Sequence, residues 1–145
     1  MEKLNINFGI PEHGWMEIIL SSPSAKISSN VSDVPCDSLY SLIKALLQLT
    51  EGSNEEIVEW SLEPDYMEWI FKQNGNDIEL AVKNPSDSNP TFIYMGEAQK
   101  FIHRFYKSLR DLEANQIWQQ PDLTERIWSW KFPSSLLATL KQKIG

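Results

Sequence analysis

Three early segments of the chain are predicted to be strands, and in the first of them apolar side chains alternate with polar ones, the pattern of a strand that buries one face. The first segment runs from Leu4 to Ile10, the second from 15 to 20, and a weaker third from 25 to 31. A Ser-Pro-Ser sequence at 22–24 predicts a turn between the second and third segments. We therefore expect a three-stranded meander at the start of the chain.

Four more strands are predicted in the middle of the chain, at 56–62, 66–72, 77–83 and 91–95. The Asn-Gly-Asn sequence at 74–76 is typical of a tight hairpin turn between two of them. Alternate positions of the first three of these strands are apolar, so we expect them to line one buried face. These positions are Val58, Trp60, Leu62, Met67, Trp69, Phe71, Ile78, Leu80 and Val82.

Three segments carry apolar residues at helical spacing. The first lies between Asp37 and Thr50, where Asp37 is the expected N-cap. The second, at 97–114, is strongly amphipathic, and the third covers 134–143. In the second segment the apolar stripe includes Phe101 and Phe105, which we expect to dock onto the sheet.

The order of these elements lacks the regular strand-helix alternation of parallel folds, and the short connections favour antiparallel neighbours. We expect an α+β fold, a largely antiparallel β-sheet with two to three helices packed on one face. The 145 residues, 41% of them hydrophobic, suffice for one core without disulfides or metals. The chain is therefore expected to be a single domain over residues 1–145.

Charge and targeting signals narrow the class of partner. Twenty acidic residues against 13 lysines and arginines give a net charge of −7, which disfavours nucleic acid and favours a basic protein. No apolar run approaches the roughly 18–20 residues that span a bilayer, so no membrane insertion is expected. A lone Cys36 cannot form an internal disulfide, and the N-terminus lacks a secretory signal, so we expect a cytoplasmic protein.

Residues that carry catalysis or bind metals are sparse. The two histidines, His13 and His103, have no partner at metal-ligand spacing, and one cysteine cannot build a zinc site. The glycines do not form a phosphate-binding loop. A nucleophilic pair of Cys36 with a histidine stays open only if the fold brings the two together. We predict no catalytic residues, no metal site and no cofactor.

Acidic residues are concentrated between Glu51 and Glu79, where nine acids accompany a single lysine, whereas the stretch 100–110 is basic. On the predicted strands, some of the acids point away from the apolar set and are expected side by side on the outer face of the sheet. A solvated sheet face is the simpler interpretation, and a surface for a cationic partner is the alternative. Those expected side by side are Glu59, Glu68 and Glu79, and the other candidate partner-binding acids are Glu55, Glu56 and Asp65.

Six tryptophans are the second unusual feature. Trp60 and Trp69 coincide with predicted core positions. Trp118, Trp128 and Trp130 lie in the least periodic region, where packing over the sheet is favoured and contact with a partner is the alternative. Trp118 and Trp128 are the candidate partner-binding residues of this group.

Several short sequences together resemble a family of small uncharacterised bacterial proteins. They are Gly14-Trp15, Val34-Pro35-x-Asp37-Ser38-Leu39, Glu63-Pro64-x-Tyr66-x-x-Trp69 and Trp130-x-Phe132-Pro133. In size and acidity the chain is also similar to immunity proteins of polymorphic-toxin and contact-dependent inhibition systems. The resemblance implies a non-enzymatic, immunity-like inhibitor that covers the basic cleft of a cognate toxin.

Two other classes of function remain open. One is a small-ligand-binding protein or small enzyme with a pocket between sheet and helices. The other is a homodimeric subunit that uses the aromatic C-terminal third of the chain as its interface.

Overall fold

The structure is a computed structural model that describes residues 3–119 and 127–145. Its elements follow the order expected from the sequence, with small shifts at their ends. They are β1 (Asn5–Phe8), β2 (Trp15–Ser22), β3 (Ala25–Ser32), α1 (Ser38–Thr50), β4 (Glu55–Ser61), β5 (Tyr66–Asn74), β6 (Asp77–Lys83), β7 (Thr91–Glu97), α2 (Ala98–Glu113), the 3-10 helix η1 (Gln116–Gln119) and α4 (Ser134–Ile144).

The strands form one antiparallel meander in the order β1-β2-β3-β4-β5-β6-β7. Strands β3 and β4 share a single residue pair, Ser32 with Ser61, so the sheet opens at this point into β1–β3 and β4–β7. The two parts meet again where the Ser22 hydroxyl, at the end of β2, donates to the Ile93 carbonyl in β7 at 2.5 Å. The meander is therefore strongly curved.

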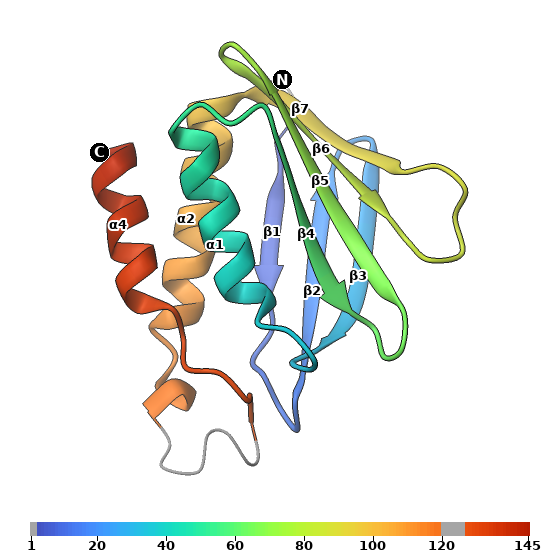
Figure 1. Cartoon of the computed structure of the whole chain (residues 1–145), viewed down its shortest axis with the longest axis vertical. Helices are drawn as coiled ribbons and strands as arrows, with labels where there is room; N and C mark the ends of the chain where they lie inside the picture. Colours follow the sequence, from blue (N-terminus) through green and yellow to red (C-terminus); the bar gives the residue numbers. More distant parts are fainter. Residues whose placement is uncertain (1–2, 120–126) are drawn as a thin grey trace.

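Helices α1, α2 and α4 lie together on one side of the sheet (Figure 1), which confirms the predicted α+β fold. Aromatic rings fill the space between the helices and the sheet. The rings of Trp60 and Trp69 lie 5.0 Å apart, and Phe105 of α2 contacts Trp69 at 6.0 Å and Phe71 at 5.9 Å. Trp60 and Trp69 are fully buried, as their spacing predicts.

Local sequence signals account for the element ends. Asp37 caps α1, because its Oδ1 accepts a hydrogen bond from the Tyr40 amide at 3.2 Å. Burial raises the pKa of Asp37, and the hydrogen bond from Tyr40 opposes that rise. Between β5 and β6 the turn has two residues, and Gly75 adopts the positive φ of 63° that such a turn requires.

The C-terminal segment is tied to β3 by a buried carboxylate. Asp33 accepts hydrogen bonds from the amide and the hydroxyl of Ser129, at 2.6 and 2.7 Å. The indole of Trp130 donates to the Asp33 carbonyl at 2.7 Å. Because a buried carboxylate must be hydrogen-bonded to be tolerated, these contacts fix how residues 129 and 130 cross the end of the sheet.

At two apolar positions the structure differs from the sequence-based expectation. Strand β1 ends at Phe8, and Ile10 is 60% exposed beyond it, because the alternation continues past the last residue that pairs with β2. Leu62 packs against the core, as expected, but is only half-buried, since β4 ends at Ser61 and Leu62 belongs to the turn that follows.

Candidate functional site

The exposed side of strands β4–β7, here called the outer face, carries an apolar row across all four strands. In this row Ile57 of β4 lies opposite Ile70 of β5, Ile70 opposite Ala81 of β6, and Ala81 opposite Phe92 of β7. Ile57 is 50% exposed and Phe92 is 41% exposed. Large apolar side chains that are this accessible and this contiguous are typical of an interaction surface.

Charged residues border the apolar row on both sides. In the first flanking row Glu59 pairs with Glu68, and Glu68 pairs with Lys83. In the second, Glu55 pairs with Lys72, Lys72 with Glu79, and Glu79 with Met95, which is 58% exposed. The outer face thus has an apolar centre between rows in which four glutamates accompany two lysines.

The register corrects the expectation that three glutamates lie side by side. Glu59 and Glu68 are direct cross-strand neighbours, as predicted. Glu79 shares the outer face, but it lies opposite Lys72, on the other side of the apolar row. The reason is that the number of residues between a glutamate and a hairpin turn decides which residue it faces on the next strand. Glu59 and Glu68 are equally far from the turn between β4 and β5, whereas Glu79 and Lys72 are equally far from the turn between β5 and β6.

Electrostatic interactions within the rows are weak. Glu59 and Glu68 repel each other across the strands, which opposes sheet pairing. The closest ion pair on the face joins Lys72 Nζ and Glu55 Oε2 at 4.0 Å, with more than half of each side chain exposed. Such exposed pairs contribute little to folding. Apart from the exposed pair of Glu55 with Lys72, the described glutamates of these rows have no ion pair and stay available to a partner.

Two of the candidate acids lie elsewhere. Glu56 is half-buried on the opposite side of β4 from Glu55, and its Oε2 accepts a hydrogen bond from the Ser53 hydroxyl at 2.6 Å. Asp65 is exposed in the turn between β4 and β5, where its carbonyl accepts from the Leu62 amide at 2.7 Å. The Glu56 carboxylate thus has a local partner, Asp65 lies in a turn, and neither residue belongs to the outer face.

The two candidate tryptophans pack within the protein. The Trp118 ring meets Phe132 edge-on at 5.1 Å, and its indole donates to the Leu112 carbonyl at 2.8 Å. Trp128 is 1% exposed and is part of the core. Packing within the protein, the favoured expectation for both rings, is what the structure shows, with Trp128 fully buried and Trp118 half-buried; contact of Trp118 with a partner stays a prediction.

Sequence reasoning missed the apolar row itself. Its members Ile57, Ile70 and Ala81 occupy the alternate strand positions that face away from the predicted core. The sequence did contain a signal for this row. Successive side chains of a strand point to opposite faces, so these residues share a face with Glu59 and Glu68 rather than with Trp60 and Trp69. On each of these strands, an apolar residue at an outer position between two charged residues marks this surface.

Other reactive residues are not brought together. The Cys36 thiol lies 3.6 Å from the Ser38 hydroxyl, His103 Nε2 lies 3.2 Å from the Ile144 carbonyl, and exposed His13 lies beside Glu12. Over residues 3–119 and 127–145 no cluster of three His, Cys, Asp or Glu side chains could hold a metal ion. Within the same ranges no helix is long and apolar enough to cross a bilayer.

Comparison with known proteins adds no further assignment. No protein-family model, no curated protein and no solved structure matches the chain. The outer face is therefore the candidate functional site on the evidence of its geometry alone.

Proposed function

We propose that the chain is a non-enzymatic protein-binding domain that acts in the cytoplasm as an immunity-like inhibitor, covering a basic surface of a partner such as a cognate toxin. The observation that carries this proposal is the apolar row Ile57, Ile70, Ala81 and Phe92, with an acidic row on each side. An exposed apolar centre inside a charged border is the usual anatomy of a protein interface.

The two parts of the outer face would have separate roles in binding. Covering Ile57 and Phe92 removes apolar surface from water, which supplies affinity. The flanking glutamates attract a cationic partner over a distance and orient it before contact. A complementary partner has an apolar patch surrounded by lysines or arginines. Inhibition then requires only that the complex covers the basic cleft, so no catalytic group is needed.

A different protein fits the outer face better than a second copy of the chain does. In a two-fold dimer through this face, the flanking rows would meet one another, and each contains two glutamates and one lysine. Net-negative rows repel. A dimer through the C-terminal third is also disfavoured, because Trp118 and Trp128 are engaged in internal packing.

The test first asks whether a gene beside that of this chain encodes a toxin domain, whose absence would count against the proposal, and then measures binding to that domain by calorimetry. The variant Ile57→Ser/Phe92→Ser removes the two most exposed large members of the apolar row. Its control is Ile10→Ser/Val34→Ser, which removes equally exposed apolar side chains outside the outer face. We expect tight binding by the natural chain, about tenfold or more weakening in the first variant, and no change in the control.

A charge variant tests the acidic rows separately. Glu59→Gln/Glu68→Gln should slow association, and the difference should shrink as salt rises, whereas the exposed pair Glu12→Gln/Glu51→Gln should not. The proposal fails if the natural chain does not bind the neighbouring toxin domain, or if the outer-face variants and their controls weaken binding equally.

A further inference from the structure

A second surface, unrelated to the outer face, lies between β1 and α2. It is an open groove of about 820 Å³, with four cationic side chains along it: Lys3, Lys100, Arg104 and Lys107. Two asparagines of β1, Asn5 and Asn7, also line it.

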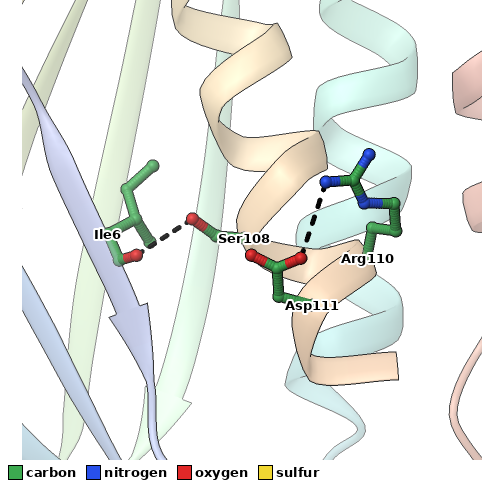
Figure 2. A network of polar contacts seen from close by, with 4 residues as sticks. All are labelled: Ile6, Ser108, Arg110 and Asp111. Atoms are coloured by element: carbon green, nitrogen blue, oxygen red, sulfur yellow. Dashed lines mark hydrogen bonds and ion pairs between the residues drawn. The ribbon is translucent and has the colours of Figure 1, made fainter. Parts of the chain in front are cut away.

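Contacts between β1 and α2 hold the walls of the groove in place. The Ser108 hydroxyl donates to the Ile6 carbonyl at 2.9 Å, and Figure 2 shows Ser108 reaching across the seam toward β1. Arg104 Nη1 lies 3.5 Å from the Leu4 carbonyl, which keeps the guanidinium at the strand. Arg110 is not part of the groove, and its guanidinium lies 3.6 Å from Asp111 (Figure 2).

The cations of the groove are largely uncompensated. Lys100 Nζ lies 4.0 Å from Glu97, but in the described part of the chain no ion pair involves Lys3, Arg104 or Lys107. Lys100, Arg104 and Lys107 follow one another at helical spacing on one face of α2, and like charges at this spacing repel. A protein of net charge −7 thus keeps three cations of the groove, Lys3, Arg104 and Lys107, without a carboxylate partner among the described residues, while Glu97 is the one acid in the described lining; a bound anion would neutralise the three.

The spacing of the lining residues fits an extended peptide. Along α2 the helical rise separates Lys100 from Arg104 by about 6 Å and Arg104 from Lys107 by about 4.5 Å. Asn5 and Asn7 lie two residues apart on a strand, or about 6.6 Å, which is also the repeat of alternate residues in an extended chain. An extended segment beside β1 could therefore present acidic side chains to α2 and hydrogen-bond to the asparagine amides.

The shape of the groove favours a peptide over a small molecule. Small-molecule sites enclose most of the ligand surface, whereas this groove is open to solvent. From Lys100 to Lys107 the helix rises by about 10.5 Å, which matches three or four residues of an extended chain.

We propose that the groove between β1 and α2 binds an extended acidic segment of another protein, with acidic side chains at alternate positions. This interaction is independent of the outer face, since the groove shares no residue with the apolar row or its flanking rows. One domain would then bind a basic surface on the sheet and an acidic segment beside α2.

The test uses the full chain and a fluorescein-labelled peptide of alternating glutamate and threonine, with binding followed by fluorescence anisotropy at low and physiological salt. The groove variant is Lys100→Glu/Arg104→Glu/Lys107→Glu. Its matched control is Lys26→Glu/Lys131→Glu/Lys141→Glu, which changes the net charge equally at exposed positions outside the groove. A milder variant, with glutamine at positions 100, 104 and 107, serves if circular dichroism shows that the first is unfolded.

We expect salt-sensitive binding by the natural chain, about tenfold or greater weakening in the groove variant, and less than about threefold weakening in the control. Equal weakening in both variants would mean that net charge alone governs binding, and this overturns the proposal. Failure of the natural chain to bind the peptide overturns it as well. Inorganic triphosphate is tested in parallel, and binding of triphosphate without the peptide would assign the groove to phosphate ligands instead.

Discussion

The substitution Phe105→Ala tests how the helices are held on the sheet. Phe105 is fully buried at the centre of α2, with ring contacts to Trp69 at 6.0 Å, Phe71 at 5.9 Å and Phe101 at 5.1 Å. Removing the ring loses the free energy gained by burying it away from water, and it leaves a cavity that neighbouring rings fill only in part. Such a change costs about 3–5 kcal/mol of the free energy of unfolding.

That loss should be large in a melting experiment. For a chain of 145 residues, 1 kcal/mol corresponds to about 3 °C, so the melting temperature should fall by about 10–15 °C. Urea unfolding at 25 °C provides the free energy directly. The control is Phe92→Ala, which removes the same side chain from an exposed position of β7 and should cost less than about 1 kcal/mol. Equal losses in the two variants would refute the placement of both rings.

Two further predictions concern charged side chains. Burial raises the pKa of Asp37 above its value in the unfolded chain, so the folded state binds this proton more tightly. The stability gained from the protonated Asp37 carboxyl is therefore complete below about pH 3.9 and is lost as the pH rises through the raised pKa. Asp37→Asn, which keeps a capping oxygen without the charge, should remove this dependence in urea unfolding at pH 3–7, and a retained dependence contradicts the assignment. Glu59→Lys, which faces Glu68, should stabilise the sheet by about 0.2–1 kcal/mol, whereas Glu79→Lys, which faces Lys72, should destabilise it by a similar amount. Shifts of the same sign in urea unfolding would show that the register is wrong.

The elements could be predicted because each one buries a single face of a regular pattern. Strand β5 alternates Met67, Trp69 and Phe71 inward with polar or aliphatic residues outward, and a one-residue slip would expose all three. The same logic fails at Ile10, where alternation continues although β1 has ended. Pattern alone does not say where hydrogen bonding to the next strand stops.

The rows of the outer face were predictable only in part. The Asn-Gly turn closes β5 and β6 with two residues, and this fixes Lys72 opposite Glu79 without further information. The pairing of Glu59 with Glu68 depends instead on a four-residue connection between β4 and β5, which can close in more than one register. The geometry of the turn therefore decides which acids become neighbours, and the amino-acid composition does not determine that geometry.

The basic groove illustrates a different limit. The cations of α2 are evident in the sequence, but the strand beside them is about a hundred residues earlier, as the contact of Ser108 with Ile6 shows. Packing between elements so distant in sequence follows from the curvature of the whole sheet, which no local pattern specifies. Sequence also does not separate Arg104, which lies at β1, from Arg110, which lies beside Asp111.

The two surfaces have opposite charge, yet their chemistry selects different partners rather than each other. Contact between the outer face of one copy and the groove of another would satisfy the glutamates and lysines. It would also bring Ile57 and Phe92 toward the ammonium groups and asparagine amides that line the groove beside Leu4 and Ile6, and this removes water from charged groups. A partner for the outer face needs an apolar centre, and a partner for the groove needs a narrow, polar, extended chain. Net charge alone, at −7, describes neither requirement, because the arrangement of a few side chains in each row decides what can bind.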